Sequence, residues 1–139
     1  MSALDSALTA GRAAARELMR DQLTITRPGA PVFDWASGTE TPGAGVTLYP
    51  PAGTPGIARV KPETGDGREV EVAEDLMTLR RYTVSLPWDT PMPVRPVPGD
   101  LAVVTASEDP RMVGLRLWVT GVGYSSTATA WRISMEDRS

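Results

Sequence analysis

The sequence contains neither cysteine nor histidine. The lack of cysteine excludes disulfide bonds, thiolate metal sites and thiol nucleophiles. The lack of histidine removes the side chain that most often transfers protons near neutral pH. Lys61 is the only lysine, and a Ser–Lys dyad with Ser85 or Ser134 remains open, although a lone lysine at the end of a strand is usually a solvated charge.

Other patterns of catalytic or metal-binding residues are also missing. The carboxylate pairs Glu108–Asp109 and Glu136–Asp137 are sequence neighbours, and adjacent side chains of an extended chain point in opposite directions. No P-loop or dinucleotide-binding glycine pattern follows a predicted strand, and the acidic residues lack the spacing of a calcium-binding loop. We therefore expect a protein without enzymatic activity, cofactor or metal.

Long apolar runs are absent as well. No stretch of about 18 apolar residues occurs, so the sequence predicts no membrane-spanning helix. Asp5 and Arg12 interrupt the N-terminus before an apolar core of signal-peptide length, and Asp5, Glu17 and Asp21 argue against a transit peptide. We expect no contact with a membrane.

The composition favours a folded, turn-rich domain. The chain has 139 residues, of which 41% are hydrophobic, with 13 glycines and 13 prolines, and this length fits one domain over residues 1–139. Alternating apolar and polar residues predict strands. These segments are residues 22–27, 56–62, 77–87, 100–107, 115–124 and 129–137.

The expected fold is mainly β: a small barrel or tight sandwich of about five to seven antiparallel strands over residues 21–137. Residues 28–56 and 63–76 are predicted to be loops, with a short hairpin from residues 32–33 to 39–41 and a short edge strand at 46–49. A change of register predicts a bulge near Arg80 and Arg81. The last two strands are expected to form an antiparallel hairpin.

One helix is predicted at the N-terminus. Ser2 and Asp5 have the spacing of a capping box, which predicts a helix over residues 2–20. Its apolar stripe either packs on its own domain, which we favour, or docks onto a neighbouring subunit, because small residues permit close approach of another backbone. The candidate interface residues on this helix are Leu4, Ala7, Leu8, Gly11, Arg12, Ala15, Arg16 and Leu18. Trp35 and the Gly/Pro-rich residues 42–56 are further candidates for contacts between subunits.

Acidic residues gather in one segment, "ETGDGREVEVAED", residues 63–75. Six carboxylates and one arginine give this segment a charge of −5, whereas the whole chain carries −3. The strands predicted on both sides make it a hairpin-length insertion. It is either a solvated hairpin or a surface that repels a polyanion.

The order of segments resembles a known family. "DQLTITR", "FDWASGTET", "ARVKP", "RRYTVSLP", "VPGDLAVVTAS", "DPRMVGLRLWVTGV" and "TAWRISMED" succeed one another as in the small head-to-tail connector proteins, of the head-closure or stopper type, of long-tailed bacteriophages, particularly those infecting actinobacteria. The resemblance runs from about Ala3 to Asp137 and rests on the order of short motifs.

The resemblance implies a β-barrel subunit that forms a ring, expected to be a dodecamer, at the head–tail junction of the virion, after assembly in the host cytoplasm. Its implied partners are a portal or adaptor protein on the head side, a tail terminator or tail tube protein on the tail side, and packaged double-stranded DNA in the channel. In similar proteins the stretch matching residues 63–76 projects toward the channel. The implied channel-facing residues are Glu63, Asp66, Arg68, Glu69, Glu71, Glu74 and Asp75.

Two other functions remain open. A tail-completion or tail-terminator subunit would form a ring at the same junction. A monomeric β-barrel module would bind nucleic acid or carbohydrate through Trp118 or Trp131, which the strand pattern can direct outward. A sequence pI near 4.9 argues against tight binding of nucleic acid by that module.

Overall fold

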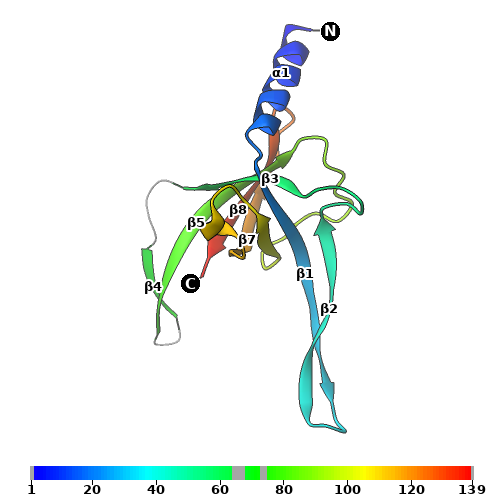
Figure 1. The fold of residues 1–139 in the computed structure, drawn as a ribbon, viewed down its shortest axis with the longest axis vertical. Coiled ribbons are helices and arrows are strands. Elements are labelled where there is room, and N and C mark those ends of the chain that lie inside the picture. The colour runs from blue at the N-terminus through cyan, green and yellow to red at the C-terminus, as the bar shows by residue number, and fades with distance from the viewer. Residues whose placement is uncertain (1, 64–67, 73–74, 139) are drawn as a thin grey trace.

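The computed structural model describes residues 2–63, 68–72 and 75–138. It contains one α-helix, a short 3-10 helix and antiparallel strands (Figure 1). The elements are α1 (Ala3–Glu17), β1 (Asp21–Asp34), β2 (Thr39–Tyr49), β3 (Ile57–Pro62), β4 (Arg68–Val72), β5 (Asp75–Pro87), β6 (Leu101–Ala106), η1 (Pro110–Met112), β7 (Arg116–Gly123) and β8 (Ala130–Asp137).

The sheet closes on itself. In the described residues, hydrogen-bonded neighbours run β1–β3–β5–β8–β7–β6, and β6 pairs again with β1. Closure leaves these six strands without a free edge, while β2 and β4 extend the sheet outside the closed part. The prediction of a mainly β fold with one N-terminal helix is confirmed.

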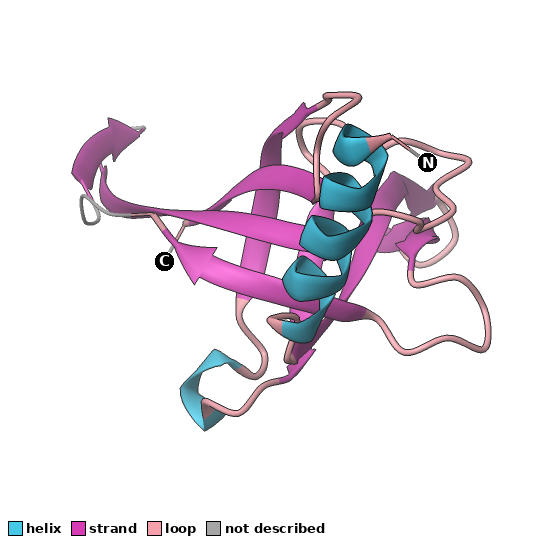
Figure 2. Ribbon diagram, turned by 90° about the horizontal axis from the view of Figure 1, so that it is seen from above, coloured by secondary structure: helices cyan, strands magenta, loops and turns pink. Residues whose placement is uncertain are grey.

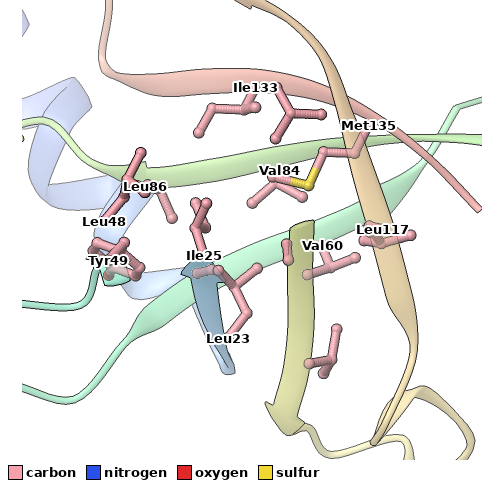
Figure 3. Close-up of a cluster of buried hydrophobic side chains, with 14 residues drawn as sticks. Leu23, Ile25, Leu48, Tyr49, Val60, Val84, Leu86, Leu117, Ile133 and Met135 are labelled. Carbon is pink, nitrogen blue, oxygen red and sulfur yellow. The ribbon is translucent and has the colours of Figure 1, made fainter. Parts of the chain in front are cut away.

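The barrel interior is filled by the side chains that the alternating pattern directs inward. Leu23 and Ile25 of β1, Val84 and Leu86 of β5, and Ile133 of β8 are at most 1% exposed. Figure 3 shows this cluster between the strands. The predicted antiparallel hairpin of β7 and β8 is also confirmed, and it contributes Leu117, Val119, Ile133 and Met135 to the core.

The prediction of a loop over residues 28–56 is wrong for most of its length. β1 continues through Pro28 and Gly29 to Asp34, and β2 pairs with it back to Tyr49. The β1–β2 ladder bends at register shifts, including one between Arg27 and Gly29. Residues 28–46, here called the arm, project away from the barrel as a two-stranded ribbon (Figure 1). The predicted pairing of residues 32–33 with 39–41 is confirmed at the end of this arm.

Glycine is required where the two strands of the arm approach most closely. Gly29 lies opposite Gly43. A Cβ atom on Gly43 would collide with the Ala30 carbonyl oxygen, and one on Gly29 with the Ala44 carbonyl oxygen. The glycines that argued for a loop therefore permit tight strand pairing.

Residues 63–76 do not form one continuous loop either. β4 pairs with the first part of β5, so that Arg68 lies opposite Leu79 and Val72 opposite Asp75. Residues 64–67 and 73–74 lie outside the described residues. The bulge predicted near Arg80 and Arg81 is wrong, because both residues stay in steady register with β8. The backbones of Met77 and Leu79 belong to the part of β5 that pairs with β4.

Helix α1 is shorter than predicted and stands apart from the barrel. It covers residues 3–17 instead of 2–20, with Ser2 as N-cap and Leu18 as C-cap. The capping box is confirmed: the Asp5 amide donates to Ser2 Oγ at 3.1 Å, and the Ser2 amide donates to Asp5 Oδ2 at 3.3 Å. No residue of the helix is buried, and Figure 1 shows it projecting from the barrel on the side opposite the arm. Packing on its own domain therefore covers little of the helix.

Candidate assembly surfaces

The tip of the arm exposes large apolar side chains. Trp35 is 89% exposed, Val32 60% and Phe33 45%. The Phe33 and Trp35 rings contact each other edge to face, with centroids 4.7 Å apart. Trp35, predicted from the sequence as an interface residue, is the most exposed of the large hydrophobic residues that the structure describes.

A polar turn holds this aromatic pair at the tip. Asp34 accepts hydrogen bonds from the Ala36 amide and the Ser37 hydroxyl, both at 2.9 Å. These hydrogen bonds, the Ser37 bond first, lower the pKa of the Asp34 carboxyl from its usual value. The Gly38 amide donates to the Asp34 carbonyl at 2.8 Å, with Gly38 at a positive φ of 69°. The tip is therefore an ordered turn that carries a negative charge.

The junction between arm and barrel is fixed by an ion pair. The Asp100 carboxylate, 2% exposed, accepts hydrogen bonds from Arg27 Nε at 3.0 Å and Arg27 Nη2 at 3.1 Å. It also accepts one from the Val97 amide at 2.8 Å, while Arg27 Nη2 donates to the Arg95 carbonyl oxygen at 3.0 Å. Asp100 raises the pKa of Arg27, chiefly through the hydrogen bonds. This contact ties the proline-rich segment between β5 and β6, residues 88–100, to the base of the arm.

An apolar hollow lies beside the attachment of the helix. Trp88, Tyr124, Ser126, Ala130 and Trp131 line a cavity of about 540 Å³. The rings of Tyr124 and Trp131 meet edge to face at 5.8 Å. We call this the aromatic pocket. Trp131 was a candidate binding residue from the sequence, whereas Trp88 and Tyr124 were not. The pocket is lined by two separate chain segments, and no local sequence pattern indicates that these segments meet.

Basic residues stand at the aromatic pocket. The Arg12 guanidinium lies 4.0 Å from the Trp88 ring centroid, and that of Arg95 lies 5.5 Å from the Tyr124 ring centroid. Arg12 Nε also donates to the Ala128 carbonyl oxygen at 3.2 Å. Arg132 donates to Thr129 Oγ1 at 3.2 Å on the adjoining turn. The contacts described for these three arginines are cation–π contacts and hydrogen bonds, and none of them is with a carboxylate. The rim of the aromatic pocket is therefore positively charged.

The predicted helix residues divide into two groups. Leu8, Gly11, Arg12 and Ala15 are partly buried, and Gly11 lies against Thr129. Leu4, Ala7, Arg16 and Leu18 are exposed, and Arg16 donates to Asp89 at 3.4 Å. Figure 2, viewed from above, shows the helix over one end of the barrel. The turn between β1 and β2, which carries Trp35, lies at the opposite end of the molecule (Figure 1), so these predicted interface residues do not form one surface within a single copy.

The residues predicted to face a channel lie on a separate projection. Glu63 is exposed directly after β3 and accepts a hydrogen bond from Thr83 Oγ1 at 3.3 Å. The backbones of Arg68, Glu69 and Glu71 belong to β4, and that of Asp75 begins β5. Asp66 and Glu74 lie outside the described residues. The β4–β5 hairpin thus extends from the barrel apart from the arm and the helix (Figure 1).

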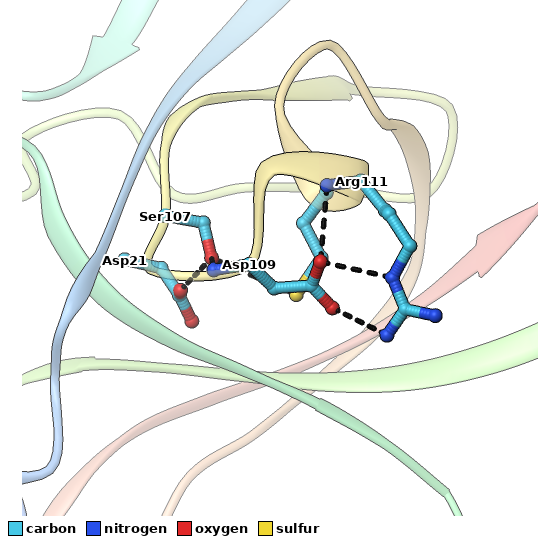
Figure 4. Close-up of polar contacts among 5 residues, drawn as sticks. Asp21, Ser107, Asp109 and Arg111 are labelled. Carbon is cyan, nitrogen blue, oxygen red and sulfur yellow. Dashed lines mark hydrogen bonds and ion pairs between the residues drawn. The ribbon is translucent and has the colours of Figure 1, made fainter.

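The carboxylates of the Glu108–Asp109 pair have structural contacts, and Asp109 belongs to a cluster with Asp21, Ser107 and Arg111. Ser107 Oγ donates to Asp21 Oδ1 at 2.7 Å and accepts from the Asp109 amide at 3.1 Å (Figure 4). Asp109 accepts from Arg111 Nε and Nη2, and these hydrogen bonds lower the pKa of the Asp109 carboxyl. Glu108 points elsewhere, to Arg20 at 3.1 Å. This cluster fixes the turn around η1.

The proposed Ser–Lys dyads can be judged from the sheet register. Lys61 lies opposite Thr83, and Thr83 lies opposite Ser134. Lys61 and Ser134 are therefore separated by two strand spacings of about 4.8 Å each. Ser85 is buried and lies opposite Arg59. Neither serine therefore lies directly opposite Lys61.

Trp118 lies on the outer surface of the barrel. It is partly buried, and the guanidinium groups of Arg138 and Arg116 lie 5.4 Å and 6.0 Å from its ring centroid. Arg138 also pairs with Glu136 at 2.8 Å.

Comparison with known proteins gives a family. Residues 11–136 match a family described as a family of unknown function (DUF6093). The chain belongs to this family. The match begins within α1 at Gly11 and ends at Glu136 in β8, so it includes the arm and the β4–β5 hairpin of the DUF6093 barrel. No curated protein matches the chain.

Among the residues that the structure describes, no group of three or more histidine, cysteine or acidic side chains could hold a metal ion. The described part of the chain has no helix that is both long and apolar enough to cross a bilayer.

Proposed function

We propose that this DUF6093 protein is a structural head-to-tail connector of a long-tailed bacteriophage, of the head-closure or stopper type. In this function it acts without catalysis, as a ring subunit between the portal or adaptor and the tail. The proposal begins from the resemblance in the order of sequence motifs. The structure adds an arrangement that suits such a subunit.

The observation that supports the proposal best is the exposure of apolar side chains on two projections. Val32, Phe33 and Trp35 are exposed on the arm, and Leu4 and Leu18 are 58% and 54% exposed on the helix. Single exposed apolar residues are ordinary, but a group of them at the end of an ordered projection is typical of an interaction surface. A subunit that contacts neighbours through its projections explains why the barrel does not cover them.

The acidic hairpin suits the lumen of such a ring. Residues 63–75 carry a charge of −5, and double-stranded DNA carries about one negative charge per 1.7 Å of its axis. Many copies of this segment around a channel would repel the phosphates over roughly 8 Å at physiological salt. DNA could then pass without adhering, and any closure of the channel would have to be steric.

The first experiment measures assembly. The purified protein is examined by mass measurement and electron microscopy, alone and with the portal and adaptor of the same phage. The expected result is a discrete ring, dodecameric if the resemblance holds. A strictly monomeric protein that binds oligonucleotides or oligosaccharides would instead favour the binding module, for which the aromatic pocket and Trp118 are the available surfaces.

The second experiment separates the two kinds of connector. Deleting the gene from the phage should give filled or leaky heads together with free, separately completed tails. Incomplete tails would favour the tail-terminator function. Normal virions would contradict both connector proposals.

A further inference from the structure

The arm tip and the aromatic pocket are two exposed apolar surfaces of different charge. The tip carries Val32, Phe33 and Trp35, and the pocket carries Trp88, Tyr124 and Trp131. Each is ordered by its own hydrogen bonds and ring contacts. Both are therefore preorganised, which lowers the entropy lost when such surfaces associate.

Their charges are complementary. Residues 28–46 contain Asp34 and Glu40 and no lysine or arginine, so the arm carries −2. The side chains of Arg12 and Arg95 lie over pocket rings, and Arg132 is bound to the adjoining turn. An acidic tip and a basic rim attract each other and favour one relative orientation.

The two surfaces cannot meet within one copy. The arm points away from the barrel on the side opposite α1 (Figure 1). The pocket adjoins the helix, because Arg12 of the helix contacts both Trp88 and Ala128. The tip of one copy is therefore available to the pocket of another.

The pocket has a suitable size for the tip. Its volume of about 540 Å³ lies in the range of about 300–1,000 Å³ that is usual for binding pockets. An aromatic side chain buries about 150–250 Å² and favours edge-to-face contact with other rings. Trp35 offers such a side chain, and its indole N–H can find an acceptor on the Ser125–Ala128 turn, which carries hydroxyl and carbonyl oxygens.

We propose that Trp35 at the arm tip of one copy inserts into the aromatic pocket of a second copy, with Asp34 and Glu40 facing Arg12, Arg95 and Arg132. The contact is heterologous, because a different surface is used on each partner. Such a contact continues from copy to copy and gives a ring if the rotation closes, or an open filament if it does not. The inference deepens the proposed function and rests on it for the closure into a ring.

Site-directed crosslinking tests the contact directly, since the protein contains no cysteine. Ala36→Cys at the tip and Ser126→Cys at the pocket are prepared as separate full-length proteins, mixed, and treated with a short bismaleimide. The expected product is a covalent heterodimer that joins residues 36 and 126. The matched control replaces Ser126→Cys with Ser134→Cys, an exposed serine on β8 outside the pocket. Equal yields from the two mixtures would overturn the proposal.

Replacement of Trp35 tests how much this side chain contributes to the affinity of self-association. Trp35→Ala should weaken self-association about tenfold or more, as expected for a central aromatic residue of an interface. Its unfolding transition should match the wild type, because the side chain is 89% exposed. Glu40→Lys should weaken association less, and the wild-type affinity should fall as salt rises. A Trp35→Ala protein that associates like the wild type, or a wild type that stays monomeric at millimolar concentration, contradicts the contact.

The outcomes separate this inference from the proposed function. Rings that form without the 36–126 crosslink, and that persist in Trp35→Ala, would overturn the arm–pocket contact and leave the connector function standing. A strong 36–126 crosslink in filaments that never close, with normal virions after gene deletion, would support the contact and overturn the connector function.

Discussion

The two halves of β1 differ in what surrounds them. From Gln22 to Thr26 the strand pairs with β6, and its Leu23 and Ile25 are buried in the barrel. From Pro28 to Asp34 the same strand pairs with β2 alone and has no buried residue. Strand pairing extends to the end of β1, with register shifts along the way, but buried side chains are confined to its first half. Pairing therefore maintains the arm as a ribbon, whereas burial supplies the stability of the barrel.

The largest expected effect compares two substitutions on this strand. Ile25→Ala removes a fully buried side chain and should lower the free energy of unfolding by about 3 kcal/mol, through lost burial and a cavity. Val32→Ala lies on the arm and should change it by no more than about 0.5 kcal/mol. Urea unfolding followed by tryptophan fluorescence measures both. Similar losses would mean that the arm is packed in solution and that the comparison fails.

The next effect concerns the junction between the two halves. Asp100→Ala removes three hydrogen bonds to a buried carboxylate and should lower the free energy of unfolding by about 2 kcal/mol. Asp89→Ala is the control, because Asp89 is exposed and pairs with Arg16 at 3.4 Å. Such surface pairs contribute about 0–1 kcal/mol. Equal stabilities of the two variants in thermal or urea unfolding would contradict a structural role for the junction.

A smaller effect on global stability is expected from the arm itself. Gly43→Ala places a Cβ atom against the Ala30 carbonyl oxygen and should separate the arm strands. Amide hydrogen exchange should become faster around residues 29 and 43 and stay unchanged in β8, with a global change below about 1 kcal/mol. Gly121→Ala, where a Cβ atom meets open space, is the control. Faster exchange in β8 would show that arm and barrel unfold as one unit.

The smallest effect is a pH dependence at the base of β2. Burial raises the pKa of the Tyr49 hydroxyl to about 12, with Arg16 acting in the opposite direction. The unfolded chain ionises this group near pH 10. The contribution of the neutral Tyr49 hydroxyl to the free energy of unfolding is therefore complete below pH 10 and is lost as the pH rises toward 12. Tyr49→Phe should reduce the loss of stability between pH 9 and 11 relative to the wild type, as measured by urea unfolding. The exposed Tyr124→Phe serves as the control, and it should lose stability as the wild type does.

The barrel could be predicted because its strands have one buried face. In β3, Ala58 and Val60 are buried while Lys61 is exposed, and β8 alternates Ile133 and Met135 with exposed Arg132 and Ser134. One-sided burial imposes a period of two on the sequence. Those strands could be read from the sequence for this reason.

The arm could not be predicted from the same pattern. Both of its faces are exposed, so burial imposes no alternation on residues 28–46. Its glycines and prolines indicated a loop, and the close approach of Gly29 and Gly43 depends on a pairing that local propensity does not encode. Trp35 was predicted as an interface residue, but the aromatic pocket was not. Its Trp88 and Tyr124 come from separate segments that only the closed barrel brings together.

The unbroken course of β1 also has a mechanical consequence. A pull on the arm tip acts along the strand axis, while the hydrogen bonds that join Leu23, Thr24 and Ile25 to β6 run perpendicular to it. Several of these hydrogen bonds then bear the load together in shear, and they do not open one at a time. Under such a pull the arm would transmit force into the barrel without peeling its strands apart.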